Sequence, residues 1–284
     1  MTGPGTIAVL GLGEAGSTIS RDLVGAGVTV RGYDPVATAP DGVVVTGSEA
    51  EACAGAGLVI SLTTAHESEA ALRAALPGVG PDALYADLNT AAPGLKQRLA
   101  QLALAAGVAF ADVAIMAPVP GRGLRTPMLV SGAAASQVTE ALNGAGGNAE
   151  LLGGPAGAAA TRKLVRSVFY KGLAAAVTEA LRAGRAAGCE EWLRGNIAGE
   201  LAAAGPGTLD RLEEGSVVHA VRRADEMSAA AQLLAELGIP ARVTEASLAW
   251  LTQLAQENAA TPSAPMITVT SQSLSLTSDR DHPK

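Results

Sequence analysis

Three glycines at a fixed spacing and one aspartate form the first group of residues that could do chemistry. Gly11, Gly13 and Gly16 follow an apolar run at residues 6–10, and Asp34 follows a second run at 28–32. A glycine turn between a strand and a helix lets a pyrophosphate approach the backbone, where the helix N-terminus offers free N–H groups. An acid about 20 residues later is placed to accept from a ribose hydroxyl. The pattern predicts a dinucleotide site made of Gly11, Leu12, Gly13, Glu14, Ala15, Gly16 and Asp34.

A second group lies on one face of a predicted helix. Lys163, Ser167 and Lys171 stand four residues apart among apolar neighbours. A lysine on a partly buried face has a lowered pKa, so it can accept a proton from a hydroxyl or donate one in the reverse direction. Ser167 could bind substrate or orient the lysine, or it could be a helix serine bonded to its own backbone. Arg162 and Arg166 leave open a solvated basic face.

Polar or small residues also follow three further predicted strands, and ligands bind at such strand ends in an open parallel sheet. The candidates to line a cofactor are Leu62, Thr63, Thr64, Asn89 and Thr90. The two threonines could instead cap the helix that follows them. The candidates to bind substrate are Met116, Ala117, Pro118 and Arg122, together with Lys171.

The elements that must position these residues alternate between strand and helix as far as residue 152. The predicted strands lie at residues 6–10, 28–32, 43–45, 58–62, 83–87, 108–115, 128–131 and 149–152. This alternation predicts an α/β fold with a parallel, doubly wound sheet of the Rossmann type. An all-helical pattern then follows, with helices at 158–187, 190–203, 209–212, 217–237 and 245–258.

The change of pattern predicts three parts of the chain. Residues 1–157 form a dinucleotide-binding domain, and residues 158–260 form a helical domain for substrate binding and dimerisation. Residues 261–284 form a mobile tail, although their alternating apolar residues could make a strand if a partner were present.

Charge and composition exclude several classes of partner. A net charge of −7 without a basic block argues against a nucleic-acid surface. Cys53 and Cys189 form neither a CxxC motif nor a disulfide framework, and no apolar stretch is long enough for a membrane span. We expect no metal site and a cytoplasmic location. Aromatic residues make up 2% of the chain, and we expect Trp192 and Trp250 to lie in the core.

The chain resembles the β-hydroxyacid dehydrogenase superfamily, which includes 3-hydroxyisobutyrate and 6-phosphogluconate dehydrogenases. The resemblance spans nearly all of residues 5–258 and is carried by GLGEAG (11–16), ADLNTAAP (86–93), FADVAIM (110–116) and GAAATRKLVRS (157–167). KLVRSVFYKG (163–172) and HAVRRADEM (219–227) resemble a poorly characterised branch with a distinctive C-terminal helical domain. The resemblance implies that Lys163 is the catalytic lysine and that two subunits pair through their helical domains.

The chain departs from the family pattern at two places. Ser167 stands where the family has an asparagine, one turn after the lysine. Met116-Ala117-Pro118 replaces the family's Ser-Gly-Gly, which contacts a substrate carboxylate, if Asp112 is aligned with the aspartate of that loop. Arg122, Arg125 or Lys171 could supply the anion contact instead.

Together these features predict an NAD(P)-dependent oxidoreductase. It would transfer a hydride between nicotinamide and a small hydroxyacid or a related acidic alcohol or carbonyl compound, with Lys163 as general acid and base. Asp34, without a basic residue after it, favours NAD, with NADP as the alternative. Two other interpretations stay open: an imine reductase, and a non-catalytic NAD(P)-binding sensor favoured by the two departures.

Overall fold

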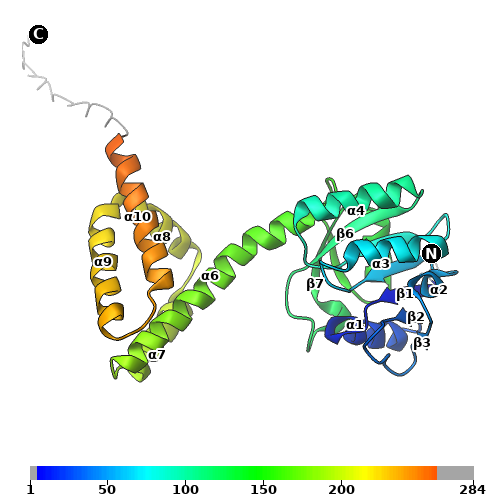
Figure 1. The fold of residues 1–284 in the computed structure, drawn as a ribbon, viewed down its shortest axis with the longest axis horizontal. Helices are drawn as coiled ribbons and strands as arrows, with labels where there is room; N and C mark the ends of the chain where they lie inside the picture. Colours follow the sequence, from blue (N-terminus) through cyan, green and yellow to red (C-terminus); the bar gives the residue numbers. More distant parts are fainter. Residues whose placement is uncertain (1–4, 261–284) are drawn as a thin grey trace, which may run out of the picture. The chain divides into compact units, whose positions relative to one another are not determined.

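The structure is a computed structural model that describes residues 5–260. The chain divides into two compact units at Lys171 and Gly172, inside the long helix α6 (Ala158–Ala186). The first unit contains a sheet covered by helices, and the second is helical (Figure 1). The tail predicted at 261–284 lies outside the described residues.

Eight strands form one sheet in the order β3-β2-β1-β4-β5-β6-β7-β8. They are β1 (Thr6–Leu10), β2 (Thr29–Tyr33), β3 (Val44–Val45), β4 (Leu58–Ser61), β5 (Leu84–Asp87), β6 (Ala109–Ile115), β7 (Pro127–Ser131) and β8 (Asn148–Leu151). The order reverses at β1, which creates the crevice between β1 and β4 where a doubly wound fold binds its ligand. The predicted fold class is confirmed.

One part of the sheet differs from the prediction of a wholly parallel arrangement. Strands β6 and β7 are antiparallel, with Ile115 opposite Met128, and β8 runs parallel to β7. The connection between β6 and β7 holds only a 3-10 turn, Gly123–Arg125. Parallel neighbours need a crossover of about a dozen residues or more, usually with a full helix, so this short connection makes a reversal.

Helices cover both faces of the sheet (Figure 1). The helices of this unit are α1 (Glu14–Gly25), α2 (Glu49–Cys53), α3 (Ser68–Ala75), α4 (Pro93–Ala105) and α5 (Ala135–Gly144). Ile19 of α1 and Val138 of α5 belong to the apolar core on one face, whereas Leu72 of α3 and Leu99 of α4 belong to the core on the other. The inner strands are continuous apolar runs because both of their faces are buried.

A row of polar side chains crosses this apolar sheet. Ser61, Asp87, Asp112 and Ser131 pair in register across β4, β5, β6 and β7, and all four are fully buried. We call these four residues the polar row. Because an unpaired buried polar group is costly, the row requires partners from the elements packed against it.

The second unit contains the end of α6 and four further helices. These are α7 (Glu190–Ala203), α8 (Pro206–Val218), α9 (Ala220–Glu236) and α10 (Arg242–Ala260). The helix predicted at 217–237 corresponds to α9, but its start is wrong, because α8 ends at Val218 and α9 begins after His219. Glu179 of α6 accepts hydrogen bonds from the backbone N–H groups of Val243 and Thr244, both at 2.8 Å, so it caps the start of α10.

The prediction that both tryptophans lie in the core is also wrong. Trp192 is 69% exposed and Trp250 is 65% exposed. The physical reason is that helices α7 and α8 bury no residue, so apolar side chains of this unit face solvent in the single chain.

No helix within residues 5–260 is both long and apolar enough to cross a membrane.

Candidate functional site

The glycine turn after β1 has the geometry that a bound pyrophosphate requires. Gly11 has a φ of +90°, and a Cβ there would lie 2.4 Å from the carbonyl oxygen of Leu62. A Cβ on Gly16 would lie 1.9 Å from the oxygen of Gly11, so glycine lets α1 approach the turn. At Gly13 the position of a Cβ has no atom within 4 Å. The space before the N-terminus of α1, which begins at Glu14, is therefore open.

Asp34 closes this turn from the end of β2. Its Oδ2 accepts from the N–H of Leu12 at 2.7 Å, and its Oδ1 accepts from Val36 at 2.8 Å and Ala37 at 2.7 Å. Partial burial raises the pKa of Asp34, whereas the three backbone donors lower it. The donors together outweigh burial, so the net pKa lies below the ordinary value for aspartate. The carboxylate is ionised near neutral pH, and Oδ2 keeps a lone pair for a ribose hydroxyl.

A pocket of about 470 Å³ lies in front of the turn. Its lining includes the predicted residues Gly11, Gly13, Asp34, Leu62, Thr63 and Thr64. Three carboxylates, those of Asp34, Glu49 and Glu67, line it, and none of the lining residues is a lysine or arginine. Arg31 of β2 is held elsewhere, because its guanidinium donates to the carbonyls of Glu51 at 2.6 Å and Ala52 at 3.2 Å.

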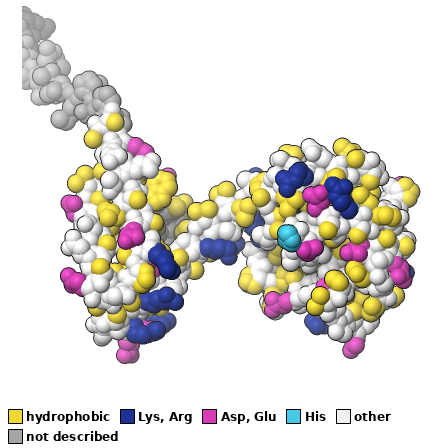
Figure 2. Space-filling view, in the orientation of Figure 1, with side chains coloured by type: hydrophobic (Ala, Val, Ile, Leu, Met, Phe, Trp, Pro, Cys, Tyr) yellow, Lys and Arg dark blue, Asp and Glu magenta, His cyan; other side chains and the backbone are white. Residues whose placement is uncertain are grey.

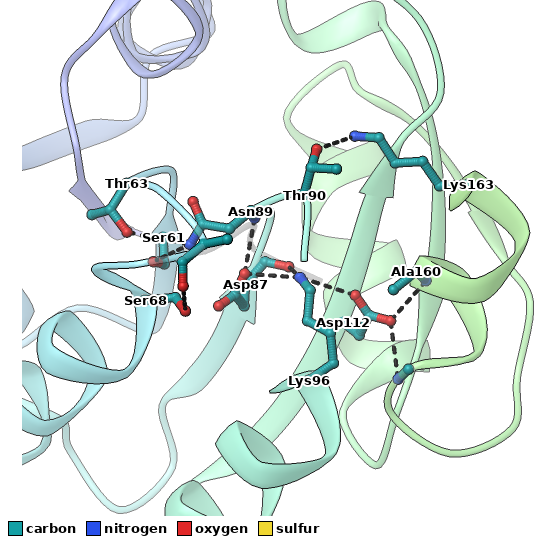
Figure 3. Close-up of polar contacts among 12 residues, drawn as sticks. Ser61, Thr63, Ser68, Asp87, Asn89, Thr90, Lys96, Asp112, Ala160 and Lys163 are labelled. Atoms are coloured by element: carbon teal, nitrogen blue, oxygen red, sulfur yellow. Dashed lines mark hydrogen bonds and ion pairs between the residues drawn. The ribbon is translucent and has the colours of Figure 1, made fainter. Parts of the chain in front are cut away.

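Asn89 links this pocket to the polar row, as Figure 3 shows. Its buried amide donates to Oγ of Ser61 at 3.2 Å and to Oγ1 of Thr63 at 3.3 Å. Its backbone N–H donates to Oδ1 of Asp87 at 2.8 Å. Oγ1 of Thr64 accepts from the N–H of Glu67 at 3.2 Å and so closes the turn before α3, whereas the N-cap of α3 itself, Glu67, makes no side-chain capping bond.

Lys163 contacts Thr90, the residue that follows Asn89 after β5. Its Nζ donates to Oγ1 of Thr90 at 2.7 Å, and the side chain is half-buried beside Ala91 and Ala114. Burial lowers the pKa of Lys163, the charge of Lys96 lowers it further, and the nearby Asp112 opposes both. The net pKa lies below the ordinary value for lysine. Thr90, predicted as a cofactor residue, is thus the hydrogen-bond partner of the predicted catalytic lysine.

Beneath this pair lies a fully buried ion cluster that the sequence interpretation missed. Nζ of Lys96 contacts Oδ1 of Asp87 at 2.8 Å, the carbonyl of Asp87 at 2.9 Å and Oδ1 of Asp112 at 3.0 Å. Oδ2 of Asp112 accepts from the N–H groups of Gly157 and Ala160, both at 3.0 Å. Two features of the sequence could have indicated this cluster. Asp112 lies inside an apolar strand, and Lys96 lies on the same face of its helix as the buried residues Leu99 and Ala103.

The remaining predicted residues are not joined to this cluster. Ser167 is half-buried one turn beyond Lys163, but no hydrogen bond within residues 5–260 connects the two side chains. Lys171 is exposed. Met116 and Ala117 follow β6 and are half-buried, whereas Pro118 is exposed. Arg122 is exposed, and the loop beside it is held against α1 because the N–H of Leu124 donates to Asp22 at 2.7 Å.

Within the described part of the chain, no group of three or more histidine, cysteine, aspartate and glutamate residues could hold a metal ion.

A glycine turn, an acid at the end of the second strand and a doubly wound sheet define a Rossmann-type dinucleotide-binding protein. The family described as "NAD binding domain of 6-phosphogluconate dehydrogenase" matches residues 6–153. A second family, described as a domain of unknown function, DUF1932, matches residues 185–254. The chain therefore belongs to the NAD-binding family of 6-phosphogluconate dehydrogenase, within the β-hydroxyacid dehydrogenase superfamily, as the resemblance predicted.

Known relatives match parts of the chain. A "Probable 3-hydroxyisobutyrate dehydrogenase" of Mycobacterium tuberculosis is 35% identical over 127 residues, which are 43% of this chain and 43% of that protein. An "NAD-dependent L-serine dehydrogenase" of Pseudomonas aeruginosa is 29% identical over 195 residues, 65% of each chain. Among solved structures, a reductive aminase from Aspergillus terreus has a TM-score of 0.75 at 22% identity and covers 89% of this chain and 94% of its own. This last likeness concerns the fold alone.

Proposed function

We propose that the protein is an NAD-dependent oxidoreductase that interconverts a small anionic hydroxy compound, such as a hydroxyacid, and the corresponding carbonyl compound. The observation that carries this proposal is the continuity of the site. Asn89 bonds to Thr63 of the nucleotide pocket, and the adjacent Thr90 bonds to Lys163. Lys163, whose amine can transfer a proton, is therefore bonded to the same segment after β5 that also contacts the dinucleotide pocket.

The residues of the first unit fit a nicotinamide dinucleotide. The open space at Gly13 and the N-terminus of α1 suit the pyrophosphate, and Oδ2 of Asp34 suits a ribose hydroxyl. We propose NAD rather than NADP, because the pocket presents three carboxylates and Arg31 is turned to backbone carbonyls. When bound, the nicotinamide supplies or accepts the hydride.

Lys163 would move the proton that accompanies hydride transfer. Its lowered pKa increases the neutral fraction near pH 7, and the neutral amine can accept the proton of a substrate hydroxyl. In the reverse direction the ammonium donates that proton. Thr90 accepts from Nζ and so fixes its direction.

The same helix would supply the attraction for an acidic substrate. Arg162, Arg166 and Lys171 are exposed around Lys163, and Ser167 lies one turn further along. Positive charges clustered near a site raise the local concentration of an anionic ligand. The two relatives are named for 3-hydroxyisobutyrate and L-serine, and each of these compounds carries a hydroxyl and a carboxylate. Their names therefore support a hydroxyacid over an imine as the substrate.

The test is a panel of hydroxyacids, ketoacids and cyclic imines, with the absorbance of the reduced nicotinamide as the readout. We expect oxidation of at least one hydroxyacid with NAD. Lys163→Met should lower turnover by about 10²-fold or more and leave NADH affinity nearly unchanged, because the amine transfers a proton and does not hold the dinucleotide.

Three results would contradict the proposal. Consumption of NADPH with imines and none with ketoacids would make the protein an imine reductase. NADH binding without turnover across the whole panel would make it a sensor. Turnover of Lys163→Met equal to that of the unmodified protein would remove Lys163 from the mechanism.

We also propose that two copies of the chain pair through the second unit. Figure 2 shows hydrophobic side chains on the visible face of this helical part. The large exposed apolar residues of the unit include Trp192, Leu201, Leu209, Leu212, Val218, Val221, Leu233 and Trp250. Exposed apolar surface of this kind supports an interaction with another chain.

A further inference from the structure

Lys96 has no part in the chemistry proposed above, yet it lies directly beneath the site. Its side chain is 1% exposed, and its Nζ contacts three oxygens of Asp87 and Asp112 within 3.0 Å (Figure 3). A charge taken out of water is retained at high cost unless it is paired and fully hydrogen-bonded. The ammonium donates hydrogen bonds to the carbonyl and Oδ1 of Asp87, and Oδ1 of Asp112 at 3.0 Å completes a second ion pair.

The contacts of Lys96 lead to both members of the Lys163–Thr90 pair. Asp87 ends β5, and Thr90 follows it by three residues. Asp112 contacts Lys96 through Oδ1. Its Oδ2 accepts from the N–H of Gly157, which directly precedes α6, and from the N–H of Ala160 in the first turn of that helix. Lys163 stands one turn beyond Ala160 on that helix. One buried ammonium therefore anchors the strand end that carries Thr90 and the helix start that carries Lys163.

The charges around Lys163 come from three elements. Lys96 of α4 and Lys171 of α6 itself are positive, and Asp112 of β6 is negative. Asp87 of β5 lies behind Lys96, and its Oδ2 is buried without a hydrogen-bond partner in the described structure. Lys96 and Asp112 thus act on Lys163 in opposite directions, although both belong to one cluster.

We propose that Lys96 is a positioning residue for the reaction, whose buried ammonium holds Thr90 and Lys163 in contact. The charge of the same ammonium adds to the effect of burial, which lowers the pKa of Lys163. This inference rests on the proposed role of Lys163 as general acid and base.

The test measures the titration of Lys163 directly. Full-length protein is treated with a trace of acetic anhydride across a pH series, and the acetylation of each lysine is quantified by peptide mass spectrometry. Lys171 in the same samples is the internal reference. Because only a neutral amine reacts, the pH midpoint of labelling reports the protonation of Lys163 without any substrate.

Two variants should shift this midpoint in opposite directions. Lys96→Met removes a like charge and leaves Asp112 uncompensated, so the midpoint of Lys163 should rise by about one pH unit. Asp112→Asn removes the opposing carboxylate, so the midpoint should fall by about the same amount. Arg98→Met, which removes a cation from an exposed position on the same helix, should leave the midpoint unchanged.

The signs separate positioning from a merely structural role. A loosened site would admit water to Lys163 in both variants, and both midpoints would then rise, which overturns the proposal. No shift in either variant also overturns it. If Lys96→Met does not fold, Lys96→Met combined with Asp87→Asn leaves one buried carboxylate instead of two, and the same rise is expected.

The labelling experiment can still be interpreted if the proposed function is wrong. Full turnover by Lys163→Met would refute the catalytic role of Lys163, whereas the labelling midpoints would still report its coupling to Lys96. Once a substrate is known, Lys96→Met should shift the pH midpoint of kcat in the same direction as the labelling midpoint and leave KM for NAD unchanged. A lower kcat with an unshifted pH midpoint would contradict a role for the charge.

Discussion

Asp34 illustrates how one residue serves both the fold and the site. Its carboxylate accepts three backbone hydrogen bonds, one from the glycine turn and two from the loop after β2. It is also one of three carboxylates that line the nucleotide pocket. The residue that would discriminate between dinucleotides is therefore the one that shapes the turn beneath them.

We expect Asp34→Asn to change stability and cofactor choice together. The amide group must place N–H donors opposite either Leu12 or the pair Val36 and Ala37, so at least one hydrogen bond is lost at a cost of about 1 kcal/mol. Loss of the negative charge should also weaken the preference for NADH over NADPH. Chemical denaturation and the two Kd values measure these effects.

Glu67→Gln is the matched control, because Glu67 lines the same pocket and its carboxylate accepts no backbone hydrogen bond in the described structure. It should leave stability unchanged. The pKa of Asp34 is lowered on folding, so its contribution is complete above the ordinary aspartate pKa and is lost as the pH falls through the folded value. The stability gap between Asp34→Asn and the unmodified protein should therefore close in acid, and a constant gap would contradict this account.

At the scale of elements, Gly13 and Gly16 lie only three residues apart, yet Gly13 leaves space for a ligand and Gly16 allows the helix to pack on the turn. Gly16 lies where α1 meets the turn, and Gly13 faces open space with a φ of −61° that any residue can adopt. The packing of a helix on its strand and the binding of a ligand at its N-terminus can thus be perturbed separately.

Alanine at each position should separate the two functions. Gly16→Ala places a Cβ 1.9 Å from the oxygen of Gly11, which forces the backbone apart and should cost about 2 kcal/mol or more of unfolding free energy. Gly13→Ala should change stability by less than about 1 kcal/mol. It should nevertheless weaken NADH binding by about tenfold or more, because its Cβ fills space needed by the pyrophosphate. Thermal denaturation and NADH fluorescence titration check both, and unchanged NADH affinity in Gly13→Ala would place the pyrophosphate elsewhere.

The strands and their bounds could be predicted from local sequence patterns. The apolar runs and glycine turns located all eight strands within one residue of their bounds, because both faces of the sheet are buried. The antiparallel pairing of β6 and β7 could not be read in the same way, since strand direction depends on the path of the connection. Asp34 was predicted by its spacing from the glycine turn, and Lys163 by its helical spacing together with the family resemblance. The cluster of Lys96, Asp87 and Asp112 instead joins residues whose proximity exists only after folding.

At the scale of the whole molecule, the exposed apolar surface of the second unit is the main feature without a partner. Trp192 and Trp250 were predicted to be buried on the general tendency of tryptophan, and that tendency does not specify which chain does the burying. A second copy would cover such residues without altering the fold of either chain.

Light scattering at micromolar concentration should give twice the mass of one chain. Trp192→Arg places a charge in the exposed apolar surface of the second unit and should shift the protein toward the monomer. Leu104→Arg is the control, because Leu104 is 75% exposed but lies in the first unit. A monomeric unmodified protein would contradict the dimer, and dissociation by Leu104→Arg alone would move the interface to the first unit.

The attachment of α6 to Asp112 has a consequence for the way the protein is made. A ribosome releases residues in order, so all eight strands have emerged once Leu151 is free. At that moment Asp112 still lacks the N–H groups of Gly157 and Ala160. A nascent chain can thus assemble every strand and still contain a buried carboxylate short of two donors. Asp112 receives these two donors during synthesis only as the turn that precedes Lys163 emerges, which couples the maturation of the sheet to the arrival of its proposed proton carrier.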